Sequence, residues 1–246
     1  MSGRRMRWLA AGAALTLGCG IMAGCGAGEQ VPPELAVLDH TGSSTAGSTE
    51  LCARHLSDYA RERYVSVTGK RGELRVDLFD AATDSEPTFP VRESFDVPAT
   101  DRSNPKRTKK DLEQRLSDLD TAIAHHLQEA GPSHGGTDVV TMLTSLGEAA
   151  RAVHAKRVWI CSDFADNRLP NPLTRAGALA VLRTVRSQGA LPDLHGLDVI
   201  LDTSSTRGRI DVTAAELSAL SLFAHQLVKD AGGTMLSYGP GAEVSD

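Results

Sequence analysis

The chain has 246 residues, with 26 lysines and arginines, 31 aspartates and glutamates, and a formal net charge of −5. This length suits one α/β domain with a substantial core and is short for two. Residues 1–24 carry three arginines and no acid, so the rest has a charge of −8, without the basic excess typical of a nucleic-acid-binding protein.

The first 24 residues have the pattern of a bacterial lipoprotein signal peptide. Three arginines precede an apolar run, Trp8 to Ala23, which is too short for a comfortable membrane span. The run ends in Met22-Ala23-Gly24-Cys25, which resembles a lipobox, in which the cysteine is lipidated. We therefore expect Cys25 to be anchored at the outer face of the cell membrane, with residues 25–33 as a short tether. An ordinary signal peptide and an uncleaved anchor are the alternatives.

Strand and helix patterns alternate along the rest of the chain. The expected strands are residues 34–39, 73–79, 89–97, 157–162, 197–201 and 234–237. The expected helices are residues 49–63, 111–129, 139–154, 172–187 and 214–229, with a polar loop at 100–110. The second and third strands suggest a hairpin. The order predicts an α/β fold with a doubly wound, mostly parallel central sheet, one antiparallel edge strand and helices on both faces. This domain spans residues 34–239 and is followed by a polar tail, 240–246.

Candidate metal ligands follow two of the strands. Asp39, Thr41 and Ser43 form a D-x-T-x-S sequence after the first strand, and Asp163 follows the strand 157–162. Thr137 belongs to a Gly-Gly-Thr sequence before a helix. Because the carboxyl ends of parallel strands meet at one edge of the sheet, Asp39 and Asp163 are expected to lie there together. Carboxylate and hydroxyl oxygens are the ligands of a hard divalent cation.

These three segments, in this order, resemble the von Willebrand factor type A (vWA) domain, whose metal-ion-dependent adhesion site is built from three such loops. The resemblance implies that Thr41, Ser43 and Thr137 supply hydroxyls, and that Asp39 and Asp163 hold the metal directly or through water. It also implies a divalent cation, Mg²⁺ first and Mn²⁺ or Ca²⁺ as alternatives, and a protein partner whose Glu or Asp completes the coordination. Thr41 replaces the usual serine, and Phe164 stands where the family often has glycine.

Two other functions stay open. A metal-free network of Asp39, Thr41 and Ser43 would make the domain a structural or assembly scaffold of the cell envelope. Asp39, Asp163, Asp166 and His134 could instead bind a metal for hydrolysis, with His40 as a general base. The sequence contains no catalytic motif of the common hydrolase, nucleotide-binding or dinucleotide-binding kinds, so we expect a binding module and not an enzyme.

Two further features are interpreted structurally. Cys52 and Cys161 are expected to be free buried thiols on a helix and a strand, although an oxidising compartment would permit a disulfide. Lys106, Arg107, Lys109 and Lys110 form a basic cluster, which we expect to be a solvated loop.

Overall fold

The computed structural model describes residues 31–41, 46–66, 71–80, 87–97, 104–131, 135–205 and 212–241. The signal peptide, Cys25 and the tail beyond residue 241 lie outside the described residues, as do Ser43 and His134. In the part of the chain that is described, no helix is both long enough and apolar enough to cross a membrane.

Six strands form one sheet in the order β3-β2-β1-β4-β5-β6. The strands are β1 (Glu34–Asp39), β2 (Glu73–Phe79), β3 (Val91–Ser94), β4 (Arg157–Cys161), β5 (Asp198–Asp202) and β6 (Thr234–Gly239). All neighbouring pairs are parallel except β2 and β3, which are antiparallel. The predicted fold class is therefore confirmed, including its antiparallel edge strand.

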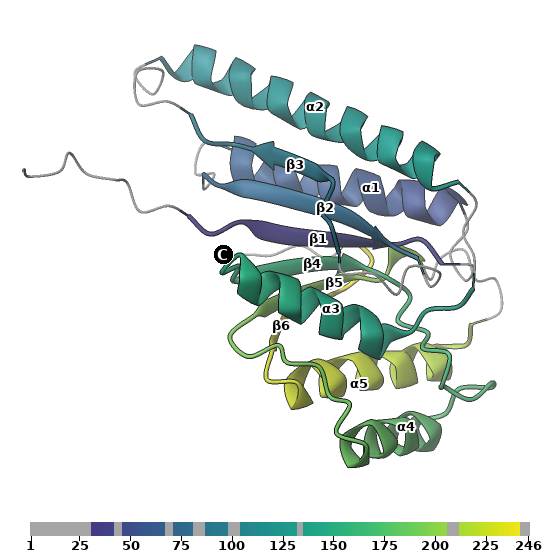
Figure 1. The fold of residues 1–246 in the computed structure, drawn as a ribbon. Helices are drawn as coiled ribbons and strands as arrows, with labels where there is room; N and C mark the ends of the chain where they lie inside the picture. Colours follow the sequence, from purple (N-terminus) through teal and green to yellow (C-terminus); the bar gives the residue numbers. More distant parts are fainter. Residues whose placement is uncertain are drawn as a thin grey trace, which may run out of the picture. The chain divides into compact units, whose positions relative to one another are not determined.

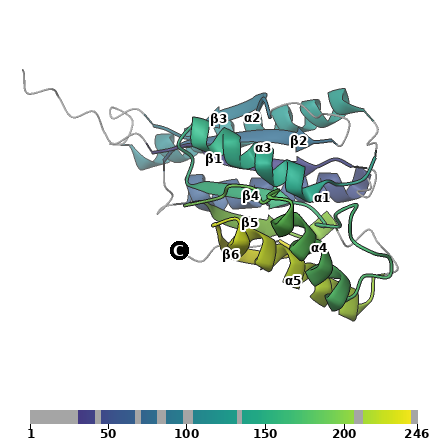
Figure 2. The ribbon, with the colours of Figure 1, turned by 60° about the horizontal axis from the view of Figure 1, so that its bottom comes forward.

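The helices are α1 (Ala46–Ala60), continued by a π turn η1 (Arg61–Val65), α2 (Pro105–Ala130), α3 (Val139–Ala152), α4 (Arg175–Ser187) and α5 (Ala214–Asp230). One hydrophobic cluster joins α1 and α2 to one face of the sheet, and another joins α3, α4 and α5 to the opposite face. Figure 1 separates the two groups of helices, and Figure 2 turns the α3 to α5 side toward the viewer. Because both faces are covered, β1 is buried along its whole length.

The largest departure in secondary structure is the start of α2. Residues 105–110, predicted as part of a loop, form its first turns. Asn104 caps this helix, since its side-chain oxygen accepts a hydrogen bond from the Arg107 amide at 3.2 Å, and Pro105 follows at the first helical position. Asparagine at the cap and proline after it are strong start signals. They outweigh the lack of apolar residues, on which the loop prediction rested.

The prediction of free thiols is wrong. Cys52 of α1 and Cys161 at the end of β4 form a disulfide, with their Cα atoms 5.8 Å apart. Both residues are fully buried in the cluster between α1 and the sheet. The helix thus packs directly over the strand, at a separation that a disulfide can bridge. The bond closes a sequence separation of 109 residues and fixes α1 to the centre of the sheet.

Candidate metal centre

The carboxyl ends of β1 and β4 bring the two predicted acidic ligands to one edge of the sheet. Asp39 is the last residue of β1, and its neighbour Leu38 pairs with Cys161, the last residue of β4. Asp163 lies two residues beyond that end. The side chains of Asp39 and Asp163 are both buried, at 1% and 2% exposure.

Asp39 is the centre of a buried hydrogen-bond network. Its Oδ2 accepts hydrogen bonds from the hydroxyl groups of Ser162 at 2.6 Å and Thr137 at 3.0 Å. Its Oδ1 accepts one from the backbone amide of Thr41 at 3.1 Å. The hydroxyl oxygens of Thr41 and Thr137 are 2.8 Å apart. Thr137, which is 98 positions from Asp39 and 96 from Thr41, therefore meets these two residues at one point.

Thr137 is positioned by the loop that precedes α3. A parallel β-bridge links Thr137 to Asp166, and the Asn167 amide donates a hydrogen bond to the Thr137 carbonyl at 3.0 Å. Asp166 in turn accepts hydrogen bonds from the Val139 amide at 3.1 Å and from the guanidinium of Arg168 at 2.8 Å. Asp166, a candidate ligand in the hydrolase alternative, thus joins the loop after β4 to the start of α3.

The electrostatics of Asp39 suit a cation. Burial raises the pKa of the Asp39 carboxyl above its ordinary value, and the nearby negative charge of Asp163 raises the pKa further. Hydrogen bonds from Ser162, Thr41 and Thr137 act in the opposite direction. Two buried carboxylates close enough to repel each other are stabilised when a cation binds between them. The donors gathered here are all oxygens, as Mg²⁺, Mn²⁺ and Ca²⁺ require, so the residues fit a hard divalent ion.

Phe164, where glycine would be the favoured residue, forms the turn after Asp163. Phe164 has a φ of 55°, in the left-handed region that favours glycine. Its side chain is fully buried in the core between the sheet and α3 to α5. The Ala165 amide donates a hydrogen bond to Asp163 Oδ1 at 2.9 Å, and the Phe164 amide donates one to Ser162 at 3.0 Å. Burial of the aromatic ring therefore holds a backbone conformation that phenylalanine alone disfavours.

The other sequence candidates are distributed as follows. His40, although adjacent to Asp39, directs Nε2 to the carbonyl of Gly131 at 2.9 Å and so joins β1 to the segment after α2. Within the described ranges, no group of three or more His, Cys, Asp or Glu residues could hold a metal ion.

Sequence reasoning missed two parts of this edge. Ser162 was noted only as part of the Ser-Asp sequence, although it makes the shortest contact to Asp39. Asp202, the last residue of β5, is fully buried and lies 2.8 Å from Nδ1 of His55 on α1. Ser204 is also 2.8 Å from that nitrogen, and the Gly241 amide donates a hydrogen bond to Asp202 at 3.0 Å. The signal was available, because Asp202 also follows an apolar strand.

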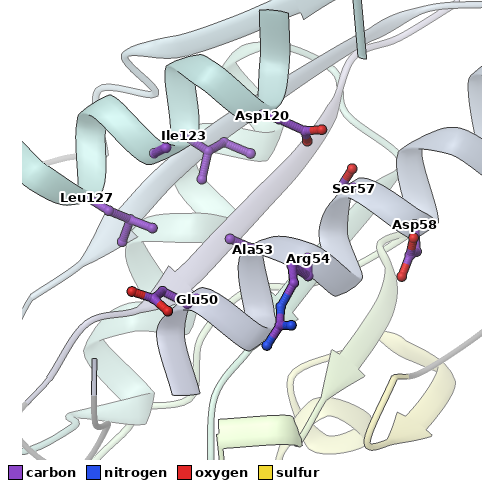
Figure 3. A pocket seen from close by; sticks show the side chains of 9 residues that line it. Glu50, Ala53, Arg54, Ser57, Asp58, Asp120, Ile123 and Leu127 are labelled. Atoms are coloured by element: carbon purple, nitrogen blue, oxygen red, sulfur yellow. The ribbon is translucent and has the colours of Figure 1, made fainter. Parts of the chain in front are cut away.

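A groove of about 610 Å³ lies between α1 and α2, away from the Asp39 network (Figure 3). Ala53, Ile123 and Leu127 form its apolar part, and Glu50, Arg54 and Asp120 are among its charged residues. It contains none of the predicted ligands.

Comparisons with known proteins return little. No family model matches the chain, and no curated protein matches it. Among solved structures, the crystal structure of manganese-loaded Plasmodium vivax TRAP protein aligns with 83% of this chain and 74% of its own, at 13% identity and a TM-score of 0.31. The fold class therefore rests on the strand order and the antiparallel edge strand, which define a doubly wound α/β sheet.

Proposed function

We propose that this chain is a membrane-anchored, extracytoplasmic binding module that recognises a partner protein through a divalent cation. Asp39, Thr41, Ser43, Thr137 and Asp163 would hold the ion, and Cys25 would carry the lipid. The observation that supports the proposal most is the meeting of two mutually repelling, buried carboxylates with two hydroxyls at the carboxyl edge.

The bound ion would supply an electrophilic position for a carboxylate of the partner. Hydroxyl ligands carry no charge, so few negative charges would neutralise the ion, and an incoming Glu or Asp would be attracted to it. Asp39 would set the position of the hydroxyls through its contacts with Thr137 and Thr41. Mg²⁺ is the ion we favour, with Mn²⁺ and Ca²⁺ as alternatives.

The disulfide supports the extracytoplasmic location. Disulfides persist in oxidising compartments and are rare in the cytosol. The Cys52–Cys161 bond is in the core and joins α1 to β4. A domain whose central strand is cross-linked in this way is suited to an environment outside the cytoplasm, where the lipobox at Cys25 would also direct it.

A metal-free scaffold of the cell envelope is the second candidate, and one observation favours it. Asp39 already accepts hydrogen bonds from Ser162, Thr137 and the Thr41 amide within the protein. Such a network could be complete without an ion, with the fold kept for metal-independent assembly.

Thermal unfolding of the chain from Gly26 onward separates the two candidates. With metal at about 100 times its dissociation constant, binding adds about 2.7 kcal/mol, or roughly 5–10 °C in Tm, relative to EDTA. Asp39→Asn should abolish this shift. In EDTA the same variant should melt at or above the wild type, because it removes a buried charge that Asp163 repels. Asp120→Asn, an exposed acid on α2, is the matched control and should keep the metal shift.

A direct titration with Mn²⁺ tests the site even if the metal binds too weakly to shift the Tm. Electron paramagnetic resonance of free Mn²⁺ detects binding even when the Tm shift is small, and loss of the free signal with wild type but not with Asp39→Asn would support the metal site. If the wild type leaves all Mn²⁺ free at high protein concentration, the metal-dependent proposal fails and the scaffold remains.

A further inference from the structure

All the lysines in the described ranges lie at one end of the domain. The chain has six lysines, of which Lys70 lies outside the described residues. Lys106, Lys109 and Lys110 are in the first two turns of α2, Lys156 directly precedes β4, and Lys229 is in the last turn of α5. These positions are at the amino edge of the parallel sheet, opposite Asp39 and Asp163.

The connection between α2 and this edge follows from the strand register. The antiparallel strand β3 ends at Ser94, which pairs with Glu73, the first residue of β2. The chain therefore returns to the amino edge before α2 begins, and Arg61 of η1 contacts Glu113 in α2 at 2.7 Å there. Figure 1 shows α2 and β1 beginning at the same end of the sheet.

The charges along α2 oppose its helix dipole and therefore lower its stability. Its first six residues, Pro105–Lys110, contain four cations and no acid, whereas residues 111–130 contain five acids and one arginine. Cations at a helix N-terminus and acids near the C-terminus oppose the helix dipole. The three lysines are exposed and form no ion pair with any described residue, while Arg107 lies 4.0 Å from Asp111. Three exposed lysines that lower the stability of the helix and have no acidic partner among the described residues indicate an external anionic surface.

Two acids at the amino edge, on the α3 to α5 side, are paired with arginines. Arg151 pairs with Asp193, and Arg186 pairs with Asp230, so these acids on the α3 to α5 side are compensated. Beside the cluster is an open hollow of about 960 Å³, with the buried side chains of Val65 and Leu112 in its lining. Its charged lining residues are the cations Arg61, Arg71, Lys106 and Lys109 and the acids Asp58, Glu62 and Glu113.

The chain that precedes β1 enters at the same edge. Glu34 is the first residue of β1, so residues 26–33 between the proposed lipid anchor and the strand are attached there. Eight residues reach about 28 Å when fully extended, which keeps the amino edge near the membrane. Surface charges act over a Debye length of about 8 Å at physiological ionic strength, so the cluster requires this proximity to act on head groups.

We infer that the basic end of α2, formed by Lys106, Arg107, Lys109 and Lys110, docks onto anionic phospholipid head groups and holds the carboxyl edge away from the membrane. The inference rests on the proposed lipid anchor for its proximity to the bilayer. Basic residues next to an anchored segment attract anionic lipids in an additive, salt-sensitive manner. Docking would convert a flexible attachment at Cys25 into a defined orientation of the metal centre.

Lysine acetylation of the full chain on vesicles tests the inference. The protein, produced with its own leader, is mixed with phosphatidylcholine vesicles with or without about 30% phosphatidylglycerol, an anionic lipid. Because lysine is absent from the described carboxyl edge, Arg175→Lys at the exposed start of α4 supplies a reporter there. Acetylation of Lys106, Lys109 and Lys110 should be at least about threefold slower on the anionic vesicles. About 0.5 M NaCl should remove the difference, and the reporter should react equally on both.

The outcomes separate the docking surface from the anchor. Equal acetylation of the three lysines on both vesicles, or equal slowing of the reporter, would overturn the docking inference while the anchor stands. If the protein associates only with the anionic vesicles, the proposed lipid anchor is refuted and the docking inference stands. If it associates with neither kind of vesicle, both are refuted. Lys109→Glu/Lys110→Glu should abolish the slowing at Lys106, whereas Arg175→Glu/Arg183→Glu, with the same charge change on exposed sites of α4, should not.

Discussion

Loss of the Cys52–Cys161 disulfide should destabilise the domain by several kcal/mol. The bond joins residues 109 positions apart, and in the chain-entropy model closing a loop of that length stabilises the fold by about 4.8 kcal/mol at 25 °C. Because both sulfur atoms are buried in the core, Cys52→Ala/Cys161→Ala also leaves two small voids. We therefore expect a loss of about 4–5 kcal/mol and a fall in Tm of roughly 8–20 °C.

Urea unfolding with and without a reductant measures this effect. Reductant should lower the unfolding midpoint of the wild type toward that of the double variant and leave the variant unchanged. Each single variant, Cys52→Ala or Cys161→Ala, should resemble the double variant, since either one removes the bond. A wild type whose free energy of unfolding falls by less than about 1 kcal/mol in reductant would refute the reasoning, because the thiols would then be free or the bond would constrain little.

Four further results are expected. Phe164→Gly relieves about 1–2 kcal/mol of left-handed strain but loses a buried ring worth about 3–5 kcal/mol, so in calorimetry it should be less stable than wild type yet more stable than Phe164→Ala. Glu34→Ala should cost about 3–5 kcal/mol in urea unfolding, because buried Glu34 accepts hydrogen bonds from Arg63 at 2.6 Å and Tyr59 at 2.6 Å. Lys106→Glu should raise Tm by about 2–4 °C, the reverse of a usual surface charge reversal, because it suits the helix dipole. Since burial raises the pKa of Asp39, the metal-free domain should lose stability in melts as pH rises from the ordinary pKa through the raised one, whereas the metal-induced shift should grow over that interval.

The sequence predicted the strands well for a physical reason. β1 and β2 both have the predicted bounds. β1 is buried on both faces and is an apolar run between Glu34 and Asp39, whereas β2 alternates, with Leu74 and Val76 buried on either side of a partly exposed residue. The start of α2 was missed because Pro105–Lys110 is helical through its cap and has no apolar face there. The periodicity of apolar residues predicts a helix only where the helix packs against the core, and the buried residues of α2 begin at Leu112.

The candidate site was predictable only in part. The strand ends place Asp39 and Asp163 at one edge, but the approach of Thr137 depends on a bridge to Asp166 that no spacing in the sequence specifies. The resemblance to vWA domains implied Thr137 as a ligand but not this bridge. The disulfide was missed for a similar reason, since the facing positions of α1 and β4 are set by packing between elements 109 residues apart. Positions along one element follow from the local pattern, whereas contacts between elements require the fold.

The same topology that gathers the acids also gathers the lysines. In a sheet of parallel strands with helical crossovers, every residue that follows a parallel strand lies at one edge and every residue that precedes one lies at the other. Asp39, Asp163 and Asp202 follow or end strands, whereas Lys156 and Lys229 precede them. Alternation along the chain therefore separates these acids from these lysines, although Asp193 and Asp230, paired with Arg151 and Arg186, also lie at the amino edge. Because β1 begins at the amino edge, an anchor attached before it would direct the carboxyl edge outward, whether or not a metal completes the site.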